Sequence, residues 1–289
     1  MTKRLLKNVA LVCVVCLLSA LLCGYAAIDN EEPLELEGVT YEKVPVYVDG
    51  VLEYSGYVID DCTYIPFRSF CSALDLGMIV SWDPDSAIAT GLAEGYELSA
   101  GQDDLYIKVN DRYFYTATGV VNYRDNILVA VRVLCDAFNI SVEWDEETGG
   151  INLITDQMQV CTSGGEFYNQ EDLYWLARII SAEAKDQSLV GKIGVGNVVL
   201  NRVESELFPN SIYEVIFDSA HGVQFSPVSN GTIYDEPCEE ALIAAKICLE
   251  GCELVGDSLY FVNPTIGSTS WFMQNCTFVT STGDHDFYA

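Results

Sequence analysis

The sequence predicts an α+β protein, in which a duplicated β-rich N-terminal module precedes a mainly helical C-terminal domain. Three observations predict this fold class. From Val44 onward, short runs of alternating apolar residues are separated by turns that contain Asp or Gly, such as Asp49-Gly50, as in hairpins. A motif recurs within that region, and after residue 168 the apolar residues change to helical spacing. The 289 residues suffice for two domains with separate cores.

Residues 1–27 are predicted to form an export signal. A basic start is followed by an apolar run from Val9 to Cys23, and Gly24-Tyr25-Ala26 offers small residues for cleavage. The run is too short to span a bilayer comfortably, so we expect a secreted protein whose mature chain has no stable membrane span. Lipidation at Cys23, or retention as an uncleaved anchor, is the alternative.

Charge and composition exclude several kinds of partner. The net charge of −29 argues against nucleic acid, because phosphate contacts need clustered Lys and Arg. The chain has two histidines, His221 and His285, so neither a zinc site nor any other metal or cofactor is expected. After the signal, residues 28–43 are acidic and contain proline, which predicts a linker.

The region 44–155 contains two copies of one motif. Residues 65–71 lead to Trp82-Asp83, and residues 129–135 lead to Trp144-Asp145; the arginines of the two copies, at 68 and 132, lie 64 positions apart. Each copy predicts strands, a short helix (67–74 or 130–138) and a strand that enters a Trp-Asp turn. The sequence therefore predicts a β-rich module of two repeats.

On these residues, above all Tyr64-Ile65-Pro66-Phe67-Arg68 and Trp82-Asp83, the module resembles the copper amine oxidase N-terminal-like (stalk) domain of exported bacterial proteins. The resemblance implies a spacer or a module that contacts the cell wall. Copper is not expected, because no histidine precedes residue 221.

Beyond a polar linker at 156–168, residues 169–289 are predicted to form the second domain. Asn169 can cap a helix over 170–185, and a second helix is expected over 188–203. Glycines at 191, 194 and 196 lower the helix propensity of the second segment, which predicts a close approach between helices. A third helix is expected from Asp235 or Pro237 to Leu249, where Gly251 supplies the stop.

Glu183 is the candidate catalytic residue. It follows Leu176 by seven positions and Ile180 by three, so it projects from the edge of the apolar face of the first helix. A carboxyl group held against apolar packing loses hydration, and its pKa rises toward the range that a general acid needs near neutral pH. An ordinary surface glutamate is the alternative on geometry alone.

Five ordered blocks make the second domain similar to the spore-cortex-lytic cell wall hydrolase family (SleB/CwlJ type). They are residues 177–184, 196–203, 224–231, 259–264 and 283–288. The resemblance implies a lysozyme-like helical fold, cleavage of peptidoglycan between N-acetylmuramic acid and N-acetylglucosamine, and Glu183 as the catalytic acid. It also implies a location in the cell wall or spore envelope, and lytic transglycosylation, which leaves a 1,6-anhydro end. The sequence departs from the family where Lys185-Asp186-Gln187 stands in place of a Gly-Glu pair.

A single acid fits that chemistry. Ordinary glycosidases use two carboxylates, and no second acid in these blocks has an obvious position. Glu183 can protonate the glycosidic oxygen and then, as a carboxylate, deprotonate the 6-hydroxyl of the sugar for internal attack.

Seven further positions are candidate substrate-binding residues, each with a structural alternative. They are Gln224, Phe225, Asn201, Arg178, Tyr260, Trp271 and His285. Aromatic rings can stack on sugar faces or belong to the core. Arg178, like Arg202, can position a polar group of the substrate or pair with a nearby acid.

The hypothesis is therefore a peptidoglycan-degrading enzyme that acts in spore cortex lysis or wall remodelling, with accessory wall proteins as further partners. One alternative is a non-catalytic exported protein that binds the wall through a decayed enzyme domain. Another is an amidase or peptidase, which the low number of histidines disfavours.

Overall fold

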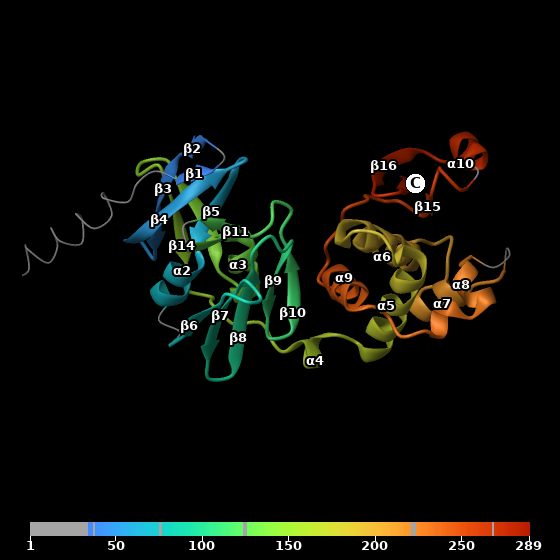
Figure 1. Ribbon diagram of the computed structural model, residues 1–289, viewed down its shortest axis with the longest axis horizontal. Coiled ribbons are helices and arrows are strands. Elements are labelled where there is room, and N and C mark those ends of the chain that lie inside the picture. The colour runs from blue at the N-terminus through green and yellow to red at the C-terminus, as the bar shows by residue number, and fades with distance from the viewer. Residues whose placement is uncertain (1–33, 37, 75–76, 124–125, 221–223, 268) are drawn as a thin grey trace, which may run out of the picture. The chain divides into compact units, whose positions relative to one another are not determined.

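The computed structural model describes residues 34–36, 38–74, 77–123, 126–220, 224–267 and 269–289 (Figure 1). The predicted export signal, including Cys23, lies outside the described residues, as does the first part of the predicted acidic linker. No helix within the described ranges is long and apolar enough to cross a membrane. The chain falls into two compact units: the first extends to Met78 and includes Val121–Gln159, and the second comprises Ile79–Val120 and Val160–Ala289.

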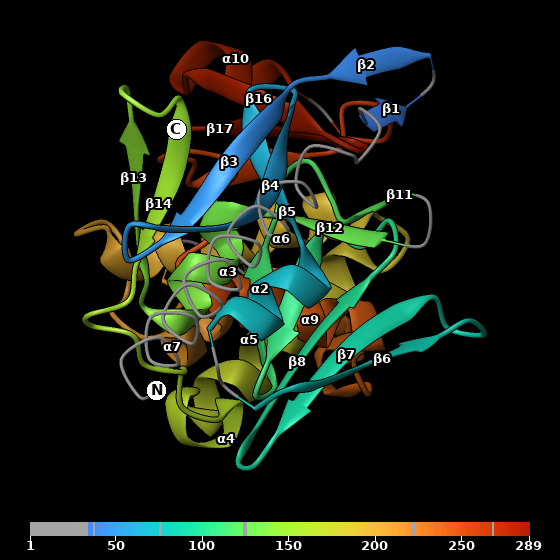
Figure 2. The ribbon, with the colours of Figure 1, turned by 90° about the vertical axis from the view of Figure 1, so that its left-hand side faces the viewer.

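The predicted α+β class is confirmed, with several sheets in the N-terminal region and mainly helices in the C-terminal region. The first unit is built on a seven-stranded sheet of order β11-β12-β5-β4-β3-β14-β13, which can be followed in Figure 2. Its strands are β3 (Lys43–Val48), β4 (Val51–Ile59), β5 (Cys62–Pro66), β11 (Val121–Tyr123), β12 (Asn126–Ala130), β13 (Ser141–Asp145) and β14 (Gly150–Ile154).

Two short helices pack against this sheet beside β5 and β12. They are α2 (Phe67–Ala73) and α3 (Val131–Phe138), close to the ranges predicted from the repeat. The rings of Phe70 and Phe138 meet edge to face at 5.4 Å, and both side chains are fully buried. The helices of the two repeats thus share one core.

Part of the stretch expected as an acidic linker is regular structure. Strands β1 (Leu34–Leu36) and β2 (Val39–Tyr41) form an antiparallel pair. Leu34 is completely buried in a cluster with Tyr57, Ile59 and Tyr64. Burying one leucine side chain is worth roughly 1.5–3 kcal/mol, which offsets part of the cost of ordering this acidic segment into strands.

The predicted repeat is visible as the same local structure at two places. Asp83 accepts hydrogen bonds from the Asp85 amide and the Ser86 hydroxyl, and Asp145 accepts them from the amides that follow it. Each Trp-Asp pair therefore ends a strand in a turn closed by its own aspartate. The region predicted as one module contributes strands to both units, because Ile79–Val120 belongs to the second.

The second unit contains a five-stranded antiparallel sheet of order β10-β9-β8-β7-β6. Its strands are β6 (Ile79–Asp83), β7 (Ile88–Ala93), β8 (Tyr96–Gly101), β9 (Tyr106–Val109) and β10 (Arg112–Tyr115). β10 contacts helix α9 (Glu239–Leu249), so the sheet is part of the same compact unit as the helices.

The helices of this unit pack on one apolar core, except α10, which has no buried residue. They are α4 (Gly164–Phe167), α5 (Gln170–Ala184), α6 (Leu189–Glu204), α7 (Ile212–Phe217), α8 (Ser226–Asn230), the 3₁₀ turn η1 (Thr232–Tyr234), α9 and α10 (Ser270–Asn275). A three-stranded sheet, β15 (Tyr260–Val262), β17 (His285–Tyr288) and β16 (Phe278–Thr282), follows near the C-terminus (red in Figure 1).

The predicted helices are confirmed, with one shift. The Asn169 side chain caps α5 by accepting from the amides of Glu171 and Asp172, as expected. α9 begins at Glu239, later than predicted, because Asp235 is extended and the Cys238 amide donates to the Ser181 hydroxyl at 3.1 Å.

The glycines of α6 permit the close approach that their spacing predicts. A Cβ at Gly196 would lie 2.6 Å from Cys248 Sγ on α9 and 2.9 Å from a methyl carbon of Ile180 on α5. A Cβ at Gly194 would lie 2.7 Å from the ring of Phe287 on β17. α6 therefore packs between its neighbours at distances that only glycine allows.

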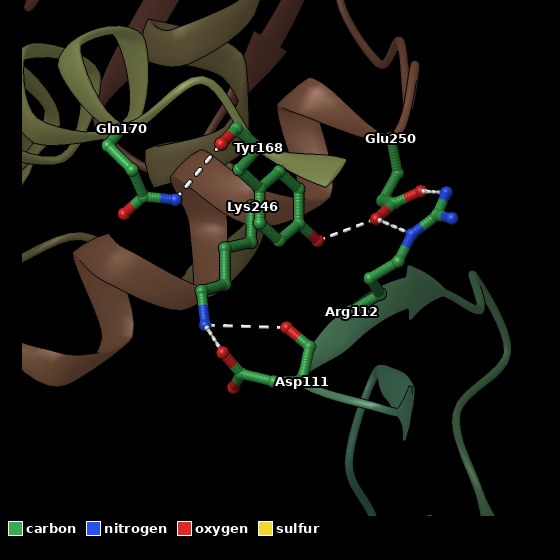
Figure 3. Close-up of polar contacts among 6 residues, drawn as sticks. All are labelled: Asp111, Arg112, Tyr168, Gln170, Lys246 and Glu250. Atoms are coloured by element: carbon green, nitrogen blue, oxygen red, sulfur yellow. Dashed lines mark hydrogen bonds and ion pairs between the residues drawn. The ribbon is translucent and has the colours of Figure 1, made fainter. Parts of the chain in front are cut away.

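Polar contacts attach the five-stranded sheet to α9 (Figure 3). Arg112 forms a two-point ion pair with Glu250, at 2.8 and 2.6 Å, and the Tyr168 hydroxyl donates to the same carboxylate at 2.6 Å. The Lys246 ammonium group pairs with Asp111 at 2.7 Å. The sheet and the helices are thus connected by charged groups within one unit.

Candidate active site

Helix α5 carries Glu183 to the penultimate position before its C-terminal end. Leu176, Ala177 and Ile180 of this helix are buried in the core, and Glu183 projects from the edge of the same apolar face. Glu183 is half-buried, and no residue in the described part of the chain donates a hydrogen bond to its carboxyl group. Loss of hydration raises the pKa of Glu183 to about 7, and the nearby guanidinium of Arg202 partly opposes the rise.

Glu183 lines a pocket of about 490 Å³. The other lining residues are Arg202, Gln224, Phe225, Ser226, Ser229, Tyr260, Phe261, Trp271 and Phe272. Among these, Glu183 is the only carboxylic acid. Five aromatic rings together with a few amide and hydroxyl groups are the lining expected of a site for a sugar, which has both apolar faces and hydroxyl edges.

Arg202 is the buried cation of the pocket. It lies on α6, donates from Nε to the Leu259 carbonyl at 2.8 Å, and has one terminal nitrogen without a partner among the described residues. Its guanidinium carbon lies 5.0 Å from the ring centre of Phe225 and 5.6 Å from that of Tyr260. Burial lowers the pKa of Arg202 to about 10, which still leaves it charged at neutral pH.

Aromatic side chains of the C-terminal segment line the same pocket as Glu183. The ring of Tyr260 on β15 lies 5.8 Å from that of Trp271 and 6.2 Å from that of Phe272, both on α10. Trp271 remains 53% exposed, so much of its ring is open to a ligand. These rings are inclined to one another by 73°, 58° and 88° and give the pocket an apolar aromatic lining.

The structure places four of the seven candidate binding residues in the pocket with Glu183, namely Gln224, Phe225, Tyr260 and Trp271. The other three lie elsewhere. Asn201 donates to the carbonyls of Gly256 and Ser258 at 2.7 and 3.0 Å, which fixes the loop before β15. His285 is buried 5.2 Å from the ring of Phe261, and burial lowers its pKa. Arg178 lines a second pocket.

Several lining residues were not among the sequence candidates. Ser226 and Ser229 lie three positions apart on α8, and Phe261 and Phe272 flank residues that were candidates. A signal for α8 exists in the Phe225-Ser226-Pro227 sequence, because proline is favoured in the first turn of a helix. Recognising that helix would have placed the two serines on one face.

Within the described residues, no group of three or more His, Cys, Asp or Glu side chains is arranged to hold a metal ion. Residues 47–153, the region that resembles a copper enzyme's N-terminal domain, contain no histidine. These side chains do not fit a copper site.

Comparison with known proteins assigns both regions. Residues 186–288 match the Cell Wall Hydrolase family, a match that begins three positions after Glu183, and residues 47–153 match the Copper amine oxidase N-terminal domain. The resemblances inferred from the sequence are therefore confirmed for both regions.

Individual relatives match the C-terminal region. The spore cortex-lytic enzyme of Bacillus cereus is 34% identical over 104 residues, which are 36% of this chain and 39% of the relative. That of Bacillus subtilis is 33% identical over 104 residues, 36% of this chain and 33% of the relative. The chain thus spans about two fifths or less of the length of these relatives.

Two solved structures are also similar. The catalytic domain of the germination-specific lytic transglycosylase SleB from Bacillus anthracis is 31% identical, with a TM-score of 0.39, covering 45% of this chain and 100% of that one. The catalytic domain of the Bacillus cereus SleB protein is 31% identical, with a TM-score of 0.39, covering 42% and 92%.

Proposed function

We propose that the C-terminal domain cleaves peptidoglycan between N-acetylmuramic acid and N-acetylglucosamine, with Glu183 as general acid and then general base. The observation that carries this proposal is the protonatable carboxyl group of Glu183, with a pKa of about 7, in a pocket lined by aromatic rings. The match of residues 186–288 to cell wall hydrolases supports the same substrate class.

The first step is protonation of the leaving oxygen. At neutral pH about half of the Glu183 side chains carry a proton, so the acid is available without a metal or a second carboxylate. As the glycosidic C–O bond breaks, positive charge develops on the sugar ring, and the ionised Glu183 beside it stabilises that charge.

The second step uses the same carboxylate as a base. Glu183 removes the proton of the 6-hydroxyl group of muramic acid, whose oxygen then forms a bond to the anomeric carbon. The product is a 1,6-anhydro end, the enzyme regains its proton, and no water is consumed. Arg202 lowers the energy of the ionised Glu183 between the two steps. Attack by water would instead make the domain a hydrolysing muramidase, and the product mass distinguishes the two.

The test compares purified wild-type protein with a Glu183→Gln variant on isolated peptidoglycan, with soluble fragments measured by mass spectrometry. We expect the variant to lose on the order of 10²–10⁴-fold in rate, the usual contribution of a general acid. The matched control is Asp186→Asn, an exposed acid that does not line the pocket. Circular dichroism checks that each variant is folded.

The outcomes separate the proposal from its rivals. Fragments lighter by one water than the hydrolysed form indicate transglycosylation. Undiminished release by Glu183→Gln contradicts the proposal. Binding to the wall without soluble product indicates a non-catalytic protein, and new free amines without new sugar ends indicate an amidase or peptidase.

We place the protein outside the cell, in the wall or spore envelope, with the β-rich N-terminal region as a spacer. Capture of an anionic wall by a chain of net charge −29 has to depend on sugar and aromatic contacts rather than on overall charge. Detection of a shortened chain in envelope or culture fractions would support export.

A further inference from the structure

A second pocket lies in the same unit as the Glu183 pocket and shares no lining residue with it. Its volume is about 470 Å³. One wall is a single face at the end of α5, where Arg178, Ser181, Ala182 and the C-cap residue Lys185 occupy positions i, i+3, i+4 and i+7. The other wall is formed by Asn230, Thr232, Asp235, Glu236 and Cys238. Ala182 and Glu183 are neighbours in the chain, so the two pockets use adjacent positions at the end of α5.

Arg178 is the fixed cation of this second pocket. It is 6% exposed, stacks on the ring of Tyr174 at 4.2 Å, and donates to the Asp235 carbonyl. Its Nε is buried without a partner among the described residues. Its ion-pair partner, Glu236 at 2.8 Å, has a side chain that is 88% exposed. The buried guanidinium of Arg178 is therefore paired with a carboxylate whose side chain is mostly exposed to solvent.

Three further side chains that line this pocket have hydrogen-bond donors available for a ligand. Lys185 is exposed and forms no ion pair with the described residues. The Ser181 hydroxyl oxygen accepts from the Cys238 amide, so its own proton is available. Asn230 accepts at Oδ1 from Thr232, which leaves its amide hydrogens to donate. An ammonium group, a hydroxyl and an amide thus line one cavity beside a buried arginine.

This set of groups selects an anion of low charge. A carboxylate accepts bonds from lysine, serine and asparagine side chains and can replace the exposed Glu236 beside Arg178. A dianionic phosphate is disfavoured, because Asp235 and Glu236 also line the pocket and would repel it.

We infer that this pocket binds a carboxylate of the short peptides attached to the muramic acid residues of the glycan strand. The inference rests on the proposed function and extends it, because it names the part of the substrate that is recognised apart from the sugars. Binding a peptide beside the Glu183 pocket fixes the position of the strand along the domain and so selects which glycosidic bond reaches the acid.

The test uses the full chain on two substrates: glycan strands that bear their peptides, and the same strands after enzymatic removal of the peptides. We expect Lys185→Gln to raise KM on the order of 5-fold on the peptide-bearing strands, with kcat unchanged and no effect on the stripped strands. Glu236→Gln, which removes the competing carboxylate, is expected to lower KM on the peptide-bearing strands. Lys108→Gln on β9 is the matched control, because it removes one positive charge and lines neither pocket.

The inference is overturned if Lys185→Gln leaves KM unchanged, or if it changes KM equally on both substrates. A binding measurement keeps this test independent of catalysis: calorimetric titration with a soluble muramoyl peptide and with the same peptide after amidation of its carboxyl groups. Preference for the free acid, lost in Lys185→Gln, supports the inference even if no strand is cleaved. Equal competition by inorganic phosphate would show an unselective anion site and contradict it.

Discussion

At the scale of single residues, the property of Glu183 that matters for catalysis is its raised pKa, which results from the partial burial of its side chain near the end of α5. The side chain is half-buried, and burial shifts its pKa upward more strongly than Arg202 shifts it downward. A raised carboxyl pKa means that the folded state binds a proton more tightly than the unfolded chain. The same shift that prepares Glu183 as an acid therefore costs stability whenever the group is ionised.

This linkage predicts how a Glu183→Gln variant responds to pH. The folded pKa is about 7 against 4.5 for the free side chain, so the penalty is absent below about pH 4.5 and complete above about pH 7. We expect the variant to match the wild type near pH 4 and to exceed its free energy of unfolding at pH 8 by on the order of 2 kcal/mol. Urea titrations at the two pH values measure this. An equal difference at both would show that Glu183 is not buried.

The same pKa predicts the pH profile of the reaction. The first step needs protonated Glu183, and the protonated fraction falls as the pH rises through about 7. We expect kcat/KM on peptidoglycan to decline about tenfold per pH unit above pH 8, because kcat/KM reports the acid in the free enzyme. Initial rates at low substrate concentration between pH 5 and 9 measure it. A profile that stays flat across this range would contradict the assignment of Glu183 as the acid.

For single residues, the sequence predicts a side chain's position best where that position depends on neighbours along the chain. The position of Glu183 beside Leu176 and Ile180 follows from helical periodicity, and its desolvation follows from that position. The contents of the pocket do not follow in this way. Tyr260 and Trp271 reach the site through turns after α9, and the direction of those turns is set by long-range packing rather than by local pattern.

At the scale of elements, the glycines of α6 indicate that neighbouring helices and strands pack closely against this helix. They lower helix propensity by up to about 1 kcal/mol each, yet the helix forms because α5, α9 and β17 surround it. The spacing predicted that some neighbour comes close. It could not say that the neighbour of Gly196 is Cys248 or that Phe287 covers Gly194, because both contacts join segments more than 50 positions apart.

Gly196→Ala tests the packing directly. The new methyl group would lie 2.6 Å from Cys248 Sγ and 2.9 Å from Ile180, so both helices have to shift. We expect a net loss of about 1–2 kcal/mol in the free energy of unfolding, since strain of 1–3 kcal/mol exceeds the gain in helix propensity. Gly165→Ala on α4 is the control: no atom lies within 4 Å of its Cβ position, so it should be neutral or stabilise the fold by up to about 1 kcal/mol. A stabilising Gly196→Ala would show that α6 is not closely packed.

At the scale of the whole molecule, the repeat and the compact units divide the chain differently. The motif predicts one module because its two copies resemble each other, and the local turns at Asp83 and Asp145 agree. The copies nevertheless contribute to different sheets: β13 pairs within the seven-stranded sheet and β6 within the five-stranded one. The strand with which β6 or β13 pairs depends on long-range contacts in the fold, and these cannot be inferred from the similarity of the two repeats.

The pair formed by Arg112 and Glu250 tests whether the five-stranded sheet stabilises the helical domain. The two side chains are 13% and 7% exposed, and Glu250 also accepts from Tyr168 (Figure 3). Removing one partner leaves the other charge buried, so we expect Arg112→Ala and Glu250→Ala each to cost about 3 kcal/mol in the free energy of unfolding. The double variant should cost clearly less than the sum of the two. Asp111→Asn should cost less, because Asp111 is 56% exposed and its backbone carbonyl stays 3.4 Å from the Lys246 ammonium group. Strictly additive losses in a denaturant-based double-mutant cycle would show that sheet and helix are not coupled through this pair.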